Sequence, residues 1–179
     1  FMEAMVVGFN PLYKQIKKLI KNNQIGEIVH VESSFGSRST KVHKHNPKQA
    51  GGALYDIGIY NIFLLTDLLG IPVEIDVSGR KNNWGVEGSV TGLFGYERGV
   101  TGNFYATMDS ISGNSAKIIG TEGMIEIPDT WTVAEKFILK KLGEKDKIFE
   151  INGDKWLGYE MDSFVNTILN GKVENEIMT

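Results

Sequence analysis

The sequence predicts an α+β domain: one large, open-faced and mainly antiparallel β-sheet with its helices packed on one face. Two observations lead to this fold class. The second half of the chain is a series of short strand-like segments joined by turn sequences, and connections that short permit only antiparallel pairing. The first half holds apolar helical segments, above all residues 51–70, which need a surface to cover.

Taken in order, the chain opens with residues 2–9, which are expected to form an apolar strand. Asn10-Pro11 then begins a helix, with proline in its first turn and with lysines on the face opposite its apolar side chains. Residues 28–35 predict a second strand. Residues 36–50 show no periodicity and form a loop of the length that is usually functional or mobile.

After the central helix the turn sequences, such as Glu97-Arg98-Gly99, divide the chain into short segments. Strands are predicted at residues 73–82, 89–96, 100–108, 116–119, 124–127, 131–142 and 147–151. A last helix, residues 156–170, is expected to turn its apolar side chains inward, and these are Phe164, Val165, Ile168 and Leu169. If the open face of the sheet is apolar, another molecule or domain must cover it.

Size and composition limit the classes of function. A chain of 179 residues suits one domain, and a net charge of −3 argues against nucleic acid or an anionic membrane as a partner. There is no cysteine, which excludes disulfides and thiol chemistry. We find neither a signal peptide nor an apolar run long enough to span a bilayer, so the cytoplasm is the expected location. The chain starts within an apolar segment, and we therefore expect it to be a piece of a longer polypeptide.

The central helix carries an acid and a phenol in apolar surroundings. Asp56 and Tyr60 are four residues apart, which places both side chains on one helix face, just after the glycine turn at Gly51-Gly52. One interpretation is structural, because a buried tyrosine usually has a hydrogen-bond partner and Asp56 would be that partner. The other interpretation is a functional pair. The residue types by themselves favour the structural one.

The surrounding motif changes that balance. The stretch Gly-Gly-Ala-Leu-x-Asp-Ile-Gly-x-Tyr, residues 51–60, resembles the helix signature of the glucose–fructose oxidoreductase/inositol dehydrogenase family, Gfo/Idh/MocA. Tyrosine at position 60, rather than the commoner histidine, is similar to the branch that contains dihydrodiol dehydrogenase. Residues 118–125 and 171–175 resemble two later segments of the same family, so the resemblance extends over nearly the whole chain.

The resemblance implies a fold of the glyceraldehyde-3-phosphate dehydrogenase C-terminal type, with residues 1–179 forming the substrate-binding and catalytic domain. The cofactor implied is NAD or NADP, bound mainly by a missing N-terminal Rossmann domain, and the substrate class is a sugar, cyclitol or diol. Tyr60 would handle the proton of the substrate hydroxyl, and Asp56 would bond the substrate or orient its neighbour. Such domains typically pair through their sheets, so a homodimer or tetramer is expected. The resemblance also implies substrate contacts from the loop before the glycine turn, at His43, Lys44, His45 and Asn46.

Several features depart from the family pattern. There is no G-x-G-x-x-G sequence to hold a dinucleotide, and the family's catalytic lysine belongs to the missing domain. A further helix that usually ends the family's domain, after the one predicted at 156–170, is expected to be missing as well. This fragment by itself is therefore expected to be inactive. Gly8 stands where the family commonly has arginine, which favours one alternative: a non-catalytic ligand-binding or oligomerisation domain with the same fold. An unrelated α+β domain that recognises a small ligand is the other. No metal site is expected, because the loop histidines lack a third ligand at a sensible spacing.

Overall fold

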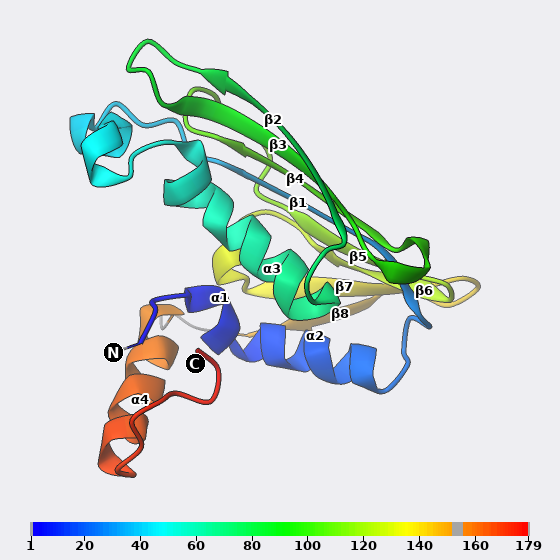
Figure 1. Ribbon diagram of the computed structural model, residues 1–179. Helices are drawn as coiled ribbons and strands as arrows, with labels where there is room; N and C mark the ends of the chain where they lie inside the picture. The colour runs from blue at the N-terminus through cyan, green and yellow to red at the C-terminus, as the bar shows by residue number, and fades with distance from the viewer. Residues whose placement is uncertain (1, 152–155, 179) are drawn as a thin grey trace.

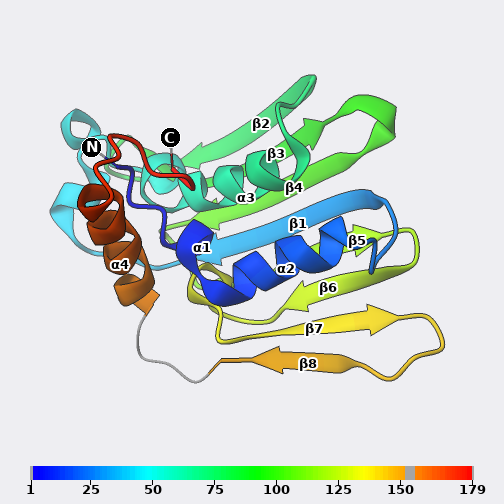
Figure 2. The same ribbon diagram turned by 90° about the horizontal axis from the view of Figure 1, so that it is seen from below.

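The computed structural model describes residues 2–151 and 156–178, and it confirms the predicted α+β class. Helices α1, α2 and α3 cover one face of a single sheet, and α4 lies at its end, beside the N-terminus (Figures 1 and 2). The helices are α1 (Val6–Phe9), α2 (Pro11–Lys21), α3 (Ile59–Leu69) and α4 (Trp156–Leu169). The strands are β1 (Ile28–Gly36), β2 (Glu74–Lys81), β3 (Glu87–Gly95), β4 (Thr101–Thr107), β5 (Ala116–Gly120), β6 (Gly123–Ile127), β7 (Lys136–Lys141) and β8 (Lys147–Glu150).

The described strands follow the order β2-β3-β4-β1-β5-β6-β7-β8. Neighbours pair antiparallel, as the short turns require, except at the centre, where β1 and β4 run parallel with Val31 opposite Gly102. This one parallel pair arises because β1 is separated from the meander by the central helix, which crosses over the sheet between them. The sheet is therefore mixed, and mainly antiparallel.

The core lies between the sheet and α3. Leu64 and Leu65 are fully buried, and Leu65 packs directly on the backbone of Gly102, where a Cβ would lie 2.7 Å from the leucine Cδ2. Phe94 and Phe104 meet edge to face beneath the helix, with ring centroids 5.9 Å apart. These contacts fix the central helix against β3 and β4, which are the strands nearest the candidate site.

The open face of the sheet is largely polar. Residues that alternate with the buried ones include Glu32 and Lys117, which form an ion pair of 2.8 Å, and Glu126 and Lys140, which form another of 2.6 Å. Such a face tolerates water. Assembly into a homodimer or tetramer through this face stays a prediction.

Two segments differ from the predicted strands. The strand predicted for residues 2–9 is wrong, since Val6–Phe9 forms a helical turn. In this turn the Gly8 N–H donates to Met5 O and the Asn10 N–H donates to Val7 O. Among the described residues this segment packs beside α2 and α4, and the helical turn pairs its backbone groups. The strand predicted at 131–142 begins later, because Trp131 is buried in a short 3-10 turn and donates its indole N–H to Ser34 O.

The predicted inward face of the last helix is also wrong. The four apolar side chains expected to be buried are between 36% and 77% exposed, whereas Glu160 on the same helix is buried. The helix packs beside α1 rather than over the sheet, so a different side of it meets the domain.

The segment Pro47–Leu69 is long and apolar enough to cross a membrane by length and composition, so the expectation that no such run exists was too strict. In the structure it contains the core helix, with Leu64 and Leu65 buried against the sheet and the buried Asn61 bonded to Ser33 of β1. It is therefore accounted for as part of the packed domain.

Candidate active site

The central helix does not begin as a regular α-helix. Residues Leu54–Gly58 form a π-helical turn that runs directly into α3. Gly58 lies at this turn, and a Cβ there would lie 3.1 Å from Ala53 O and 3.6 Å from the Ala106 Cβ of β4. The glycine thus lets the widened turn press against the sheet. Single π-helical turns inside helices are frequently found at functional sites, and this one carries Asp56 with Tyr60 just beyond it.

The glycine pair before the helix binds the preceding loop. Gly51 N–H donates to Asn46 O and Gly52 N–H donates to Lys44 O, each over 2.9 Å. A Cβ at position 51 would lie 2.6 Å from both Asn46 N and Lys44 O, and Gly52 has φ +126°, so neither position suits a side chain. The loop can therefore lie directly on the start of the helix.

This contact brings Lys44 to Asp56. The Lys44 Nζ lies 2.8 Å from Asp56 Oδ2, and both side chains are about three-quarters buried or slightly less. Sequence reasoning placed Lys44 at the substrate rim and assigned the cation near the site to a missing domain. The spacing of 12 residues across an irregular loop carries no periodic signal that would have predicted the ion pair.

Tyr60 is half-buried and packs edge to face on Phe35, with ring centroids 5.7 Å apart. Burial raises the pKa of its phenol above the ordinary value, and the negative charges of Asp56, Glu160 and Glu3 act in the same direction, whereas Lys44 lowers the pKa. Within residues 2–151 and 156–178 no hydrogen bond joins Tyr60 to Asp56, whose carboxylate is paired with Lys44 instead. The pair is therefore not the bonded core couple of the structural interpretation.

The other loop residues mainly shape the loop. His45 is buried, with Nε2 2.8 Å from Ser39 O and Nδ1 3.1 Å from the Asn82 amide, and its ring stacks on Trp84. The Asn46 side chain accepts the Lys48 N–H, which caps a short 3-10 turn. His43 is exposed. Their substrate contacts stay predictions, and Lys44 is the member of this group that reaches Asp56.

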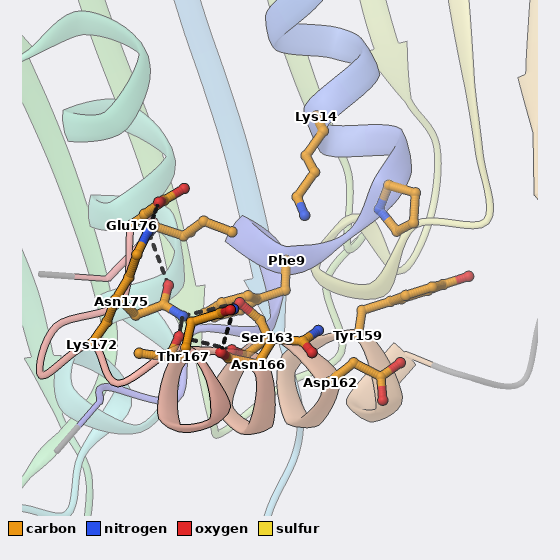
Figure 3. Close-up of a pocket in the computed structure, with 13 residues that line it drawn as sticks. Phe9, Lys14, Tyr159, Asp162, Ser163, Asn166, Thr167, Lys172, Asn175 and Glu176 are labelled. Carbon is orange, nitrogen blue, oxygen red and sulfur yellow. Dashed lines mark hydrogen bonds and ion pairs between the residues drawn. The ribbon is translucent and has the colours of Figure 1, made fainter.

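Two hollows lie elsewhere on the domain. One, of about 490 Å³, lies between α2 and α4, where Lys14 points in from α2 and Asp162 and Asn166 come from α4 (Figure 3). The other, of about 600 Å³, lies at the far ends of α2 and α3 and is lined by Leu68, Leu69 and other residues. Neither Asp56 nor Tyr60 lines either hollow, so both hollows are separate from the candidate site. Among the described residues no group of three or more His, Cys, Asp or Glu is arranged to hold a metal ion.

The open, mainly antiparallel sheet and the glycine-led central helix together are features of one class of α+β domain. The chain belongs to the Gfo/Idh/MocA family, because the model of the GFO/IDH/MocA C-terminal domain matches residues 13–126. This confirms the resemblance carried by the motif.

Curated relatives are trans-1,2-dihydrobenzene-1,2-diol dehydrogenases. The one from Bos taurus is 32% identical over 75% of this chain and 42% of its own length, and the one from Oryctolagus cuniculus is 27% identical over 99% of this chain and 57% of its own length. The chain thus spans about half the length of the curated relatives it matches.

Solved structures with the same fold cover nearly the whole chain. An aldose-aldose oxidoreductase from Caulobacter crescentus, complexed with glycerol, has a TM-score of 0.85 at 21% identity and covers 99% of this chain and 56% of its own. A 3-ketoreductase from Actinomadura kijaniata, in complex with NADP and TDP-benzene, has a TM-score of 0.83 at 20% identity, with shares of 99% and 57%. A levoglucosan dehydrogenase with NADH and levoglucosan has a TM-score of 0.82 at 16% identity, with shares of 96% and 57%.

Proposed function

We propose that this chain is the substrate-side domain of an NAD(P)-dependent oxidoreductase that interconverts a secondary alcohol and a ketone. The observation that carries the proposal is the Tyr60 phenol standing beside the Lys44–Asp56 ion pair at the start of the central helix. A sugar, cyclitol or diol is the substrate class, supported by relatives named as diol dehydrogenases and by a structural neighbour that holds levoglucosan.

The residues around Tyr60 fit the nicotinamide end of such a cofactor and not its phosphates. Asp56, Glu160 and Glu3 place negative charge near Tyr60, which suits the positively charged ring of an oxidised nicotinamide. The chain has no G-x-G-x-x-G turn to hold a pyrophosphate. A dinucleotide-binding domain outside these 179 residues would supply that turn. When bound, the cofactor takes up or delivers the hydride.

Tyr60 handles the proton. In alcohol oxidation Tyr60 acts in its phenolate form: its oxygen takes the hydroxyl proton, the carbinol carbon gives up a hydride, and a C=O double bond forms. In ketone reduction Tyr60 donates that proton to the carbonyl oxygen. Because burial and neighbouring carboxylates raise its pKa, the phenol is protonated at neutral pH, which prepares it for the reduction direction.

Asp56 and Lys44 act together beside the phenol. The Asp56 carboxylate is an acceptor for a neighbouring hydroxyl of the substrate, and the charge-assisted contact with Lys44 restricts its orientation. Lys44 also brings a positive charge, which opposes the rise in the pKa of Tyr60. Alcohol oxidation needs Tyr60 to accept a proton, so Lys44 favours that direction.

Gly8, the sequence feature that favoured a non-catalytic domain, has a packing explanation. A Cβ at this position would lie 3.0 Å from Ile177 Cγ2 and 3.2 Å from Phe63 Cζ, so glycine lets both side chains pack closely on the buried helical turn. Packing is therefore one explanation for Gly8, and the non-catalytic domain stays the alternative.

The test compares the full-length polypeptide with residues 1–179. A panel of sugars, cyclitols and vicinal diols is offered with NAD⁺ and NADP⁺, and reduced nicotinamide is followed by absorbance. We expect the full-length polypeptide to oxidise a member of the panel, and residues 1–179 to bind dinucleotide negligibly and turn nothing over. Micromolar dinucleotide binding to residues 1–179, or a full-length polypeptide inert toward the whole panel, would contradict the proposal.

A further inference from the structure

His45 joins the loop of residues 36–50 to the β2–β3 hairpin, and both segments lie at the same end of the sheet (Figure 1). The side chain is 3% exposed, and both ring nitrogens have partners. Nε2 lies 2.8 Å from Ser39 O, and Nδ1 lies 3.1 Å from the side-chain nitrogen of Asn82. The ring also stacks on Trp84, with centroids 5.6 Å apart. A buried ring that is bonded at both nitrogens fixes the loop against the hairpin.

The partners of His45 define its protonation state. Ser39 O is a carbonyl oxygen and can only accept, so Nε2 carries the proton. The Asn82 amide is oriented by a second contact, because its oxygen accepts the Trp84 N–H over 2.9 Å and its NH₂ group therefore faces His45. Nδ1 is then the acceptor, and the imidazole is neutral. A second proton on the ring would place two donors opposite each other at Nδ1.

Rotation of the Asn82 amide would not relieve that conflict. It would turn the amide nitrogen toward the Trp84 N–H and the amide oxygen toward Asp109, whose Oδ1 now lies 3.5 Å from the nitrogen. Asp109 is itself paired with Arg80 of β2 over 2.6 Å. These two residues and Arg38 of the loop are the charged groups that line the hollow of about 250 Å³ beside the imidazole, among the described residues. The contacts at this junction are therefore those of a neutral ring.

The same loop segment brings Lys44 to Asp56. Lys44 directly precedes His45, and its Nζ lies 2.8 Å from Asp56 Oδ2. The carbonyls of the residues before and after His45 accept the N–H groups of Gly52 and Gly51, each over 2.9 Å. The backbone on both sides of His45 thus lies on the glycine pair, while the buried ring is bonded to the hairpin. A displacement of the ring would move the Lys44 backbone with it.

We propose that neutral His45 is a positioning residue for the Lys44–Asp56 ion pair, and that protonation of His45 releases the loop from the hairpin. This inference rests on the proposed function, which gives Lys44 and Asp56 their role beside the substrate. Histidine is the side chain that ordinarily titrates between pH 5 and 8. An imidazole freed to water takes up a proton at about pH 6.5, so at pH 5.5 protonation favours the released loop by about tenfold.

Hydrogen exchange of the Gly51 and Gly52 amides tests this release without any turnover. The loop carbonyls protect both amides, so in the full-length protein their exchange, corrected for the intrinsic rate, should be about tenfold faster at pH 5.5 than at pH 7.5. His45→Gln keeps a neutral donor for Ser39 O and should remove this pH dependence. His43→Gln changes an exposed histidine of the same loop and should behave like wild type.

A double-mutant cycle tests whether His45 acts through Lys44. His45→Phe keeps a ring on Trp84 and removes both hydrogen bonds, so kcat/KM for alcohol oxidation should fall by up to about tenfold, as in Lys44→Met. If the histidine works by positioning the lysine, the double variant should be no slower than Lys44→Met. His45→Gln should restore most of the activity at pH 7.5. A histidine that only stabilises the fold would lower kcat/KM by the same factor in both backgrounds.

Exchange at Gly51 and Gly52 that is independent of pH in wild type, or equally dependent on pH in His45→Gln, would overturn the proposal. Multiplicative losses in the double variant would overturn the positioning role. If His45→Phe fails to fold, the exchange of wild type and of His45→Gln still decides the question. A full-length polypeptide that turns nothing over refutes the proposed chemistry, whereas the exchange result still decides whether neutral His45 holds the loop.

Discussion

A tyrosine, an aspartate and a lysine meet at each end of the central helix, but the two groups are bonded differently. At the far end, the Tyr13 hydroxyl donates to Asp67 over 2.6 Å, and Lys17 Nζ lies 2.9 Å from both Asp67 oxygens. At the start, Lys44 pairs with Asp56 over 2.8 Å, and the described residues show no bond from that carboxylate to Tyr60.

This difference supports a structural role for Tyr13, whereas among the described residues the Tyr60 hydroxyl has no bond to Asp56. Tyr13 is 4% exposed, and burial, followed by the charge and hydrogen bond of Asp67, raises its pKa well above the ordinary value. Tyr60 is half-buried, and its pKa is raised by burial and Asp56 while Lys44 opposes the rise. A hydroxyl already bonded to a carboxylate within the core cannot serve a substrate, whereas an unbonded one beside an ion pair can.

The largest expected effect is on catalysis at Tyr60. Changing Tyr60 to Phe in the full-length protein removes one hydroxyl and keeps the ring on Phe35, so turnover should fall by about 10²–10⁴-fold with little change in melting temperature. Steady-state kinetics and thermal melts measure both. Wild-type turnover combined with a clearly lowered melting temperature would make Tyr60 the structural residue after all.

Asp56→Asn should have the next largest effect. It removes the charge from the acceptor proposed for a substrate hydroxyl, and a hydrogen bond to a charged group contributes about 1.5–3 kcal/mol, equivalent to a loss in kcat/KM of about 10- to 150-fold. The matched control is Asp67→Asn at the other end of the helix, which should lower the melting temperature and leave kcat/KM intact. Equal kinetic losses in both variants would remove the distinction between the two groups.

Lys44→Met should reduce oxidation by a smaller factor, at most about tenfold, because the ion pair is partly solvated. Since Lys44 lowers the pKa of Tyr60, its loss raises that pKa further. In ketone reduction, which needs the protonated phenol, the fall in rate at alkaline pH should therefore move to higher pH. Lys44→Arg should restore the wild-type profile, and Lys48→Met, an exposed lysine of the same loop, is the control. An unmoved profile in Lys44→Met would show that the lysine does not act on Tyr60.

Tyr13→Phe tests the structural group. Removing the hydroxyl that bonds Asp67 should cost about 1–3 kcal/mol of unfolding free energy, or roughly 2–12 °C in melting temperature for a domain of this size. Turnover of the full-length protein should be unaffected. A variant as stable as wild type would mean that water replaces the lost bond without cost.

The smallest effect is expected at Glu160. Burial, and then the charge of Glu3, raises the pKa of this carboxyl. A raised pKa favours the protonated form in the folded state, so the contribution to stability is present below the ordinary carboxyl pKa and is lost as pH rises through the raised value. Glu160→Gln should therefore raise the melting temperature at pH 7 more than at pH 4. Equal shifts in melting temperature at the two pH values would contradict a raised pKa for Glu160.

The fold class, the central helix and nearly all strands of the sheet could be predicted from the sequence alone. Alternation within segments such as residues 89–96, and turn sequences such as Glu97-Arg98-Gly99, are local properties of the sequence. They can be recognised without knowing which other elements pack against these segments. The motif that begins at Gly51 was enough to identify the family. Its glycines are needed where the backbone of the preceding loop contacts the start of one helix. Both interpretations of Asp56 and Tyr60 were also present in the sequence.

The choice between the structural and the functional interpretation of Asp56 and Tyr60 depends on contacts between elements that are far apart in the sequence. Lys44 meets Asp56 across an irregular loop, and Tyr13 meets Asp67 over a separation of 54 residues, so no local period records either contact. The same holds for α1, where a segment with two valines forms a helical turn. It also holds for α4, whose apolar side chains face outward. Helical periodicity shows that an apolar side exists, but which surface it meets depends on where the other elements lie in space.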